Sequence, residues 1–253
     1  MTLIKASLKR ARHLERLAQW LLLETLLLNQ RTHSIKTLKQ SLGTSGRLDA
    51  EFYQEKYERN EALIQAHHHA HLHELVKIKK SIEPGSGAYK STGVPFVRVS
   101  NLSPLGISPT EVFLSPSQEF EPLYPKEGEV LFSKDGSVGI AYCVPHNLEV
   151  VLSGAILRLV IGDKTKINPH YFALVLNSQM TQLQAQRHII GSVIAHLSVE
   201  TISHFLIPLL PLNLQEQIAN KLQESFNYGQ QAKQLLTQAK LEVEEVLRGV
   251  KRC

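Results

Sequence analysis

The sequence has few cysteines and no apolar run long enough to span a membrane. Only two of its 253 residues are cysteines, Cys143 within an apolar run and Cys253 at the end. Two cysteines exclude a disulfide framework and a thiolate metal site. The most apolar run, residues 17–28, contains Glu24 and is shorter than the roughly 20 residues that cross a bilayer. Basic residues precede this run, as in a secretory signal, but no small-residue cleavage site follows it. We therefore expect a cytoplasmic protein with no membrane segment.

The signatures of several enzyme classes are also missing. The sequence has no Walker-type phosphate loop and no serine or cysteine in a nucleophile elbow. We predict no catalytic residues and no cofactor. Residues 168–171 (NPHY) are similar to the Asn-Pro-Pro-Tyr motif of amino-methyltransferases, but the second proline is missing. Residues 82–168 also lack the glycine-rich turn and the strand-helix alternation that a methyl-donor site needs. We interpret Asn168 as a helix N-cap and Pro169 as the first helical residue; a small adenine amino-methyltransferase fragment is the alternative.

The charge is moderately positive and unevenly distributed. The formal net charge is +5, and eight lysines and arginines lie within residues 1–46 against two glutamates. A positive charge favours a polyanionic partner. Because the remainder of the chain is nearly balanced, charge does not locate a nucleic-acid site.

The pattern of apolar residues predicts helices at both ends and strands in the middle. Helical spacing of leucines predicts a helix over residues 5–28, and an acidic first turn predicts a second over residues 49–80. Residues 43–46 (GTSG) indicate a loop between them. Short β-prone runs separated by Pro, Gly, Ser and Asn predict a mainly β segment from about residue 82 to 169. A helix from Asn168 towards Arg187 and a long polar helix after Pro211 complete the prediction.

The last helix has the apolar spacing of a coiled coil. Alternating steps of three and four residues define a seam of Ala232, Leu236, Ala239, Val243, Val246 and Val250. Such a seam requires a partner helix. Residues 11–26 align without gaps with residues 232–247 at five identities, which leaves open whether the two ends pair within one chain, between chains, or not at all.

Five histidines gather in a short stretch: His67, His68, His69, His71 and His73. The i, i+4 pairs among them have the spacing of metal ligands on a helix. No third ligand follows at a defined spacing. We therefore interpret the stretch as a solvated helix face, or as a stretch that packs beside a nucleic-acid partner, and predict no metal site.

Five ordered segments resemble the specificity subunits of type I restriction-modification systems. They are RLDAEFY at 47–53, GVPFVRVSNL at 93–102, LFSKDGSVG at 131–139, GSVIAHL at 191–197, and IPLLPL at 207–212 with EQIA at 216–219. The resemblance covers about residues 47–220 and implies an α+β fold. It consists of a mixed α/β target-recognition domain (43–210), an N-terminal helical segment (1–42) and a C-terminal coiled-coil spacer (211–253).

Members of ordinary length carry two recognition domains, whereas this sequence carries one. The resemblance therefore implies a non-catalytic subunit that forms a homodimer through Leu236, Ala239, Val243, Val246 and Val250. A two-fold dimer reads two inverted half-sites separated by a fixed gap in double-stranded DNA. Methyltransferase subunits, and restriction subunits in addition, are the expected protein partners. A truncated, inactive subunit that serves only for interaction is the alternative.

Side chains that match base edges in the major groove are the candidates for DNA contact. Polar residues next to strand ends and glycine turns within the five segments provide them: Arg98, Ser100, Asn101, Lys134, Asp135, Ser137, Arg187, Ser192 and His196. The opposing interpretation is that Asp135, Gly136 and Ser137 only close a tight turn.

Overall fold

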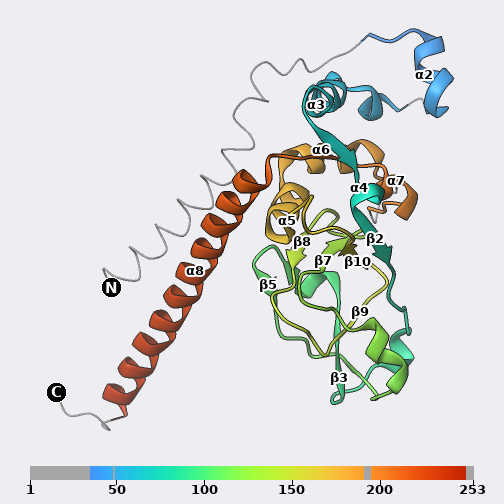
Figure 1. The fold of residues 1–253 in the computed structure, drawn as a ribbon. Coiled ribbons are helices and arrows are strands. Elements are labelled where there is room, and N and C mark those ends of the chain that lie inside the picture. Colours follow the sequence, from blue (N-terminus) through green and yellow to red (C-terminus); the bar gives the residue numbers. More distant parts are fainter. Residues whose placement is uncertain (1–34, 48, 191–194, 249–253) are drawn as a thin grey trace. The chain divides into compact units, whose positions relative to one another are not determined.

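The computed structural model describes residues 35–47, 49–190 and 195–248 (Figure 1). The chain divides into two compact units, one of residues 23–215 and the other of residues 1–22 with 216–253. The predicted N-terminal helix over residues 5–28, and the candidate residues Ser192 and Val250, lie outside the described ranges.

The described part of the first unit begins with three short helical elements, α2 (Leu38–Ser45), the 3-10 helix η1 (Ala50–Tyr53) and α3 (Glu55–Gln65). Thr37 and Gln40 form a capping box at the start of α2. The predicted loop over residues 43–46 is wrong, because α2 continues to Ser45 and ends at Gly46. Gly46 adopts the left-handed conformation (φ 64°) that commonly ends a helix.

The predicted helix over residues 49–80 ends at Gln65. The chain beyond it forms β1 (His69–His71), the single turn α4 (Leu72–Leu75) and β2 (Val76–Lys79). β1 pairs with β11 (Leu206–Pro208), and β2 pairs with β10 (Ile156–Ile161). These partners lie far along the sequence, so the backbone hydrogen bonds that favour strands here have no local sequence signal.

The predicted mainly β segment is confirmed. An antiparallel sheet has the order β2-β10-β7-β8, where β7 is Val130–Ser133 and β8 is Ala141–Cys143. A second sheet has the order β6-β3-β9, in which β3 (Val94–Val97) runs parallel to β9 (Val151–Leu152) and antiparallel to β6 (Phe113–Leu114). A hairpin joins β4 (Leu102–Ser103) to β5 (Gly106–Ile107). Three 3-10 helices complete the segment: η2 (Ser86–Ala88), η3 (Val99–Asn101) and η4 (Gln118–Leu123).

A buried ion pair joins β10 to the start of β7. The guanidinium of Arg158 is 2% exposed and donates to both carboxylate oxygens of Glu129, at 2.7 and 2.9 Å. It also donates to the backbone oxygen of Pro122 at 2.8 Å. The guanidinium is thus paired on both sides, as a buried charge requires.

Two helices follow the sheets where one was predicted. α5 (Pro169–Asn177) packs against β7 and β8, as Figure 1 shows, and α6 (Gln179–His188) packs against α3. Asn168 caps α5 by accepting hydrogen bonds from the backbone of His170 and Tyr171 at 2.9 and 3.2 Å, so the helix-cap interpretation is confirmed. The extended backbone of Ser178 separates the two helices. A short helix, α7 (Val199–Ser203), precedes β11.

Cys143 lies in the core. Its side chain is buried on β8, and burial raises the pKa of its thiol to about 12. A thiol with such a high pKa is unreactive near neutral pH.

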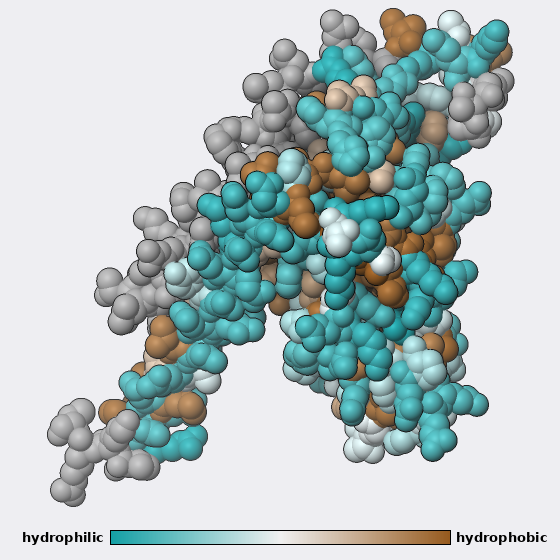
Figure 2. Space-filling model, viewed as in Figure 1, coloured by the Kyte–Doolittle hydropathy of each residue, from teal (hydrophilic) through white to brown (hydrophobic). Residues whose placement is uncertain are grey.

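The long helix after Pro211 is α8 (Leu212–Leu247), which by its 36 residues is about 54 Å long. Gln215 in its first turn joins the helix to the preceding chain, accepting from Asn168 N at 2.9 Å and donating to Leu210 O at 2.8 Å. The later part of the helix carries exposed apolar side chains (Figure 2), at Leu235, Leu236, Leu241, Val243, Val246 and Leu247. No helix within the described ranges is both long and apolar enough to cross a membrane.

Candidate nucleic-acid interface

The glycine turn between β7 and β8 is held by its own backbone and by α6. The Ser133 hydroxyl donates to Ser137 O at 2.6 Å and accepts from Ile140 N at 2.9 Å. Gly139 has a positive φ of 91° and lies against Gln182, whose amide donates to Gly139 O at 2.8 Å. The positive φ favours a glycine here, and a side chain at this position would displace the Gln182 amide that donates to Gly139 O.

Three candidate residues form one network beside this turn. Lys134 Nζ lies 2.5 Å from one carboxylate oxygen of Asp135, and the other oxygen contacts Nδ1 of His196. The backbone is joined as well, because Gly136 N donates to Ala195 O at 2.9 Å. Each carboxylate oxygen of Asp135 therefore has a partner within the fold, while the His196 side chain is 52% exposed. Ser137 is also exposed.

The second group of candidates follows β3. Asn101 accepts a hydrogen bond from Arg98 N at 3.1 Å and donates to Pro109 O at 3.1 Å, so both ends of its amide hold the loop together. Arg98 and Ser100 are exposed. Of these three residues, the free side-chain groups belong to Arg98 and Ser100.

The structure brings these two groups to neighbouring positions. Ser153 N donates to Val97 O at 2.8 Å at the end of β3, and Lys134 N donates to Ala155 O at 2.9 Å at the end of β7. The short segment 153–155 thus connects the residue before Arg98 to the start of the glycine turn. We call the exposed residues Arg98, Ser100, Ser137 and His196 the candidate DNA face.

Arg187 has other partners. Its guanidinium lies 2.8 Å from Glu61 on α3 and stacks 4.7 Å from the ring centre of Phe52 on η1. The side chain is only 13% exposed. Arg187 therefore holds α6 to η1 and α3.

The segment 47–53 has a similar structural role. Arg47 pairs with both carboxylate oxygens of Asp49 at 2.7 and 2.6 Å and lies 4.7 Å from the Phe52 ring centre. The Tyr53 hydroxyl donates to Arg47 O at 2.7 Å. Phe52 thus contacts two guanidinium groups, an arrangement that joins η1 to Arg47 and to α6.

The five histidines do not form one helix face, because His69 and His71 lie on β1 and only His73 lies in a helix, α4. The helix-face interpretation is therefore wrong. The rings of His71, His73 and His204 lie 5.5–6.1 Å apart between centres, and each Nδ1 contacts a backbone oxygen. No group of three or more ligands able to hold a metal is found among the described residues.

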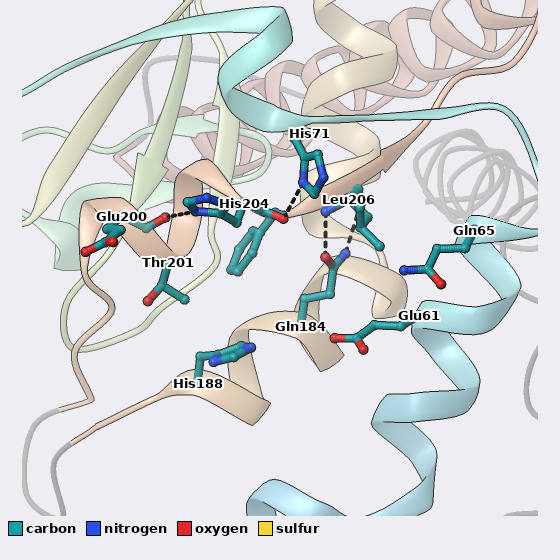
Figure 3. A pocket seen from close by; sticks show the side chains of 10 residues that line it. Glu61, Gln65, His71, Gln184, His188, Glu200, Thr201, His204 and Leu206 are labelled. Atoms are coloured by element: carbon teal, nitrogen blue, oxygen red, sulfur yellow. Dashed lines mark hydrogen bonds between the residues drawn. The ribbon is translucent and has the colours of Figure 1, made fainter. Parts of the chain in front are cut away.

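A polar pocket of about 470 Å³ lies next to these histidines (Figure 3). Glu61 and Gln65 reach into it from α3, facing His188 on α6 and His71 on β1. At its base the Gln184 amide donates to Leu206 O at 3.0 Å and accepts from Leu206 N at 2.7 Å. Glutamines on a polar helix carry no sequence signal of such a contact, so Gln184 is not among the predicted site residues.

The pocket contains a histidine that makes stability depend on pH. Burial and the nearby charge of Arg187 lower the pKa of His188, whose ring lies 5.5 Å from that of Phe52. In the unfolded chain its pKa is about 6.5. Below that pH the unfolded chain binds more protons than the folded protein, so the free energy of unfolding falls as the pH decreases.

We expect a His188→Gln variant to lose less stability than the native protein between pH 7.5 and pH 5.5. The variant lacks the Phe52 contact and starts from a lower stability at pH 7.5. Urea unfolding at the two pH values measures both effects. An equal loss in the two proteins on acidification contradicts the assignment.

Comparisons with known proteins show which family the chain is similar to. The family model described as the type I restriction modification DNA specificity domain matches residues 70–243. A search of curated proteins finds no significant match.

Solved structures of type I restriction-modification proteins are similar to the chain. One, from work on complex assembly and conformational transition of the type I R-M system, is 18% identical over 97% of this chain and 51% of its own, with a TM-score of 0.53. The HsdS subunit from Thermoanaerobacter tengcongensis is 19% identical over 92% of this chain and 50% of its own (TM-score 0.49). The type I restriction-modification S subunit from M. genitalium is 15% identical over 62% of this chain and 38% of its own (TM-score 0.47).

The chain thus spans about half or less of the length of these structures. The sequence identities to these structures are low, and the first structure described supports the fold alone. The family model covers more than two thirds of the sequence. On that match, the chain belongs to the type I restriction modification DNA specificity domain family.

Proposed function

We propose that this chain is a half-length specificity subunit that reads one half-site of DNA and, as a homodimer, a split inverted-repeat target for methyltransferase subunits. Restriction subunits are further partners of the same complex. The observation that carries the proposal is that the described residues contain one compact unit followed by one long helix, α8, whose large apolar side chains from Leu235 onward are exposed. A specificity domain that reads a two-part site needs a second reading unit.

Exposed Leu236, Val243 and Val246 support association through α8. Together with Ala239 they continue the seam with steps of three and four residues, and a coiled-coil partner covers such a seam. A second copy of the chain offers an identical seam. Two-fold symmetry then presents the two recognition units to inverted half-sites.

Within the recognition unit, for which we retain residues 43–210, we propose that the candidate DNA face makes the contacts. Arg98, Ser100, Ser137 and His196 are exposed, whereas the amide of Asn101 and the carboxylate of Asp135 are occupied by the fold. Lys134 and Arg187 are paired with acids. These four paired residues position the loops, and Ser192 stays a predicted contact outside the described residues.

The subunit itself has no catalytic role in this proposal. The contacts of Asn168 and Tyr171 weigh against a methyltransferase fragment: the Asn168 side chain caps α5, and the buried Tyr171 hydroxyl donates to Pro208 O at 2.9 Å. Neither side chain is available to grip a base. An inactive, truncated subunit remains the second candidate, since the exposed seam of α8 fits pairing without DNA reading as well.

Methylation of a random DNA library by the purified chain with its cognate methyltransferase tests the proposal. We expect methylation at two inverted half-sites with a fixed gap. An Arg98→Ala variant is expected to lower binding of the target about 5- to 160-fold, because a bidentate contact to a base contributes about 1–3 kcal/mol.

Arg59→Ala is the matched control, because Arg59 pairs with Glu55 on α3, outside the candidate DNA face. It is expected to leave the target preference unchanged. Dimerisation without any sequence preference would favour the inactive subunit and overturn the proposed function.

A further inference from the structure

The β4–β5 hairpin has an exposed leucine at its tip. β4 and β5 pair through Leu102 with Ile107 and Ser103 with Gly106, which leaves Pro104 and Leu105 as the two turn residues. The Leu105 side chain is 58% exposed. A single exposed leucine is common on protein surfaces, so its meaning depends on what surrounds it.

The hairpin is held firmly at both ends. At the tip, the Ser103 hydroxyl donates to Gly106 O at 2.9 Å, and Pro104 restricts the backbone. At the base, Asn101 O accepts from Ser108 N at 2.8 Å. Leu102 is buried in a core cluster that also contains Val97 and Leu131, and Ile107 packs against it. Leu105 is therefore presented on a rigid support.

The hairpin is also a direct continuation of the candidate DNA face. Arg98 and Ser100 lie in the turn that leads into β4, and Asn101 ties Arg98 N to the hairpin base. The strands rise about 3.3 Å per residue, so the tip lies about 7 Å beyond the base.

The shape and chemistry of the tip match one feature of the major groove. The groove admits a two-stranded β-ribbon, and the thymine C5-methyl is the apolar group displayed there. Arg98 supplies the positive charge that attracts the phosphates or guanine, and the leucine at the tip supplies an apolar surface without hydrogen-bonding groups.

We propose that Leu105 is a specificity-determining residue that contacts a thymine methyl group in each half-site. This inference rests on the proposed function, because it requires that the subunit reads DNA. The role of the hairpin tip differs from that of the polar contacts. The Leu105 side chain recognises the C5-methyl group, which thymine has and which cytosine and uracil lack.

The test uses the full chain in complex with its methyltransferase and DNA in which each thymine of the target is replaced, one at a time, by deoxyuridine. For the native complex we expect one position per half-site at which loss of the methyl weakens binding about fourfold, the factor for one apolar carbon. For Leu105→Ala we expect about tenfold weaker binding to the thymine target and no further effect of uracil at that position. Leu105→Met, which keeps an apolar tip, is expected to retain the uracil effect.

Leu38→Ala is the matched control, because Leu38 is 70% exposed on α2 and lies outside the hairpin. It is expected to leave both binding and the uracil effect unchanged. An unchanged thermal unfolding midpoint of the Leu105 variants shows that they fold.

The outcomes separate the two proposals. A native complex without any sequence preference overturns the proposed function. Three results with a sequence-specific native complex overturn the role of Leu105 and leave the proposed function unaffected. The half-sites lack thymine, every uracil substitution is neutral, or the uracil substitutions have the same effect in Leu105→Ala as in the native complex.

Discussion

Replacing Glu129 with alanine is expected to lower the free energy of unfolding by about 3–5 kcal/mol, the cost of removing one partner of a buried ion pair. Arg158 is 2% exposed, and its guanidinium has two hydrogen bonds to Glu129. The backbone oxygen of Pro122 remains as a partner after the substitution, but it has no charge to balance the guanidinium. The variant therefore keeps an uncompensated charge between β7 and β10.

Urea unfolding followed by circular dichroism measures this loss. A double variant, Glu129→Leu with Arg158→Met, is expected to recover most of the stability, because well-packed apolar residues replace buried ion pairs at little cost. Arg59→Ala, which breaks the exposed pair with Glu55, is expected to cost less than about 1 kcal/mol. A Glu129→Ala variant as stable as the native protein would contradict the assignment of this pair as buried.

Replacing Val243 with aspartate is expected to abolish the proposed homodimer. Val243 is 59% exposed in the single chain, and the proposed dimer would bury it in the seam of α8. An unpaired carboxylate in an apolar seam costs about 3 kcal/mol or more, which weakens association by more than about 100-fold. Methylation of the split target is expected to disappear with the dimer. The recognition unit is expected to unfold at the same urea concentration as before, since the substitution lies outside it.

Solution mass by light scattering at micromolar concentration measures the association. Gln234→Asp is the matched control: Gln234 is exposed and lies two residues before Leu236, which places it about 200° around the helix from the seam. This control is expected to remain dimeric. A dimeric Val243→Asp variant would show that association uses another surface, whereas a monomeric native chain, alone and with its methyltransferase, would remove the dimer altogether.

The five sequence segments that carry the family resemblance act mainly as structural supports where the structure describes them. Arg47, Asp49 and Phe52 stabilise the start of the recognition unit, and Asn101 closes the turn after β3. Gly139 permits the close approach of Gln182. We therefore expect base reading to depend more on exposed residues such as Arg98 and Leu105.

The sequence by itself determined the features that rest on neighbouring residues. The β-rich middle, the Asn168 cap of α5 and the long helix α8 follow from residue spacing and capping chemistry, and the structure confirms each of them. The order of the five segments also identified the family. The cap and the helix follow from interactions between residues a few positions apart, whereas the β-prone composition of the middle segment predicts strands without specifying which strands pair.

Only the tertiary structure decided the features that depend on distant partners. Residues 69–71 and 76–79 form strands because β11 and β10 provide their hydrogen bonds, although the sequence predicted a helix over this stretch. The sequence predicts Arg187 as a DNA contact, whereas the structure places its guanidinium against Glu61 and Phe52, which lie more than 120 residues earlier in the chain. Asp135 and His196 likewise meet across 61 residues. Contacts at such separations are set by how the sheets and helices pack, and no local pattern of residues encodes them.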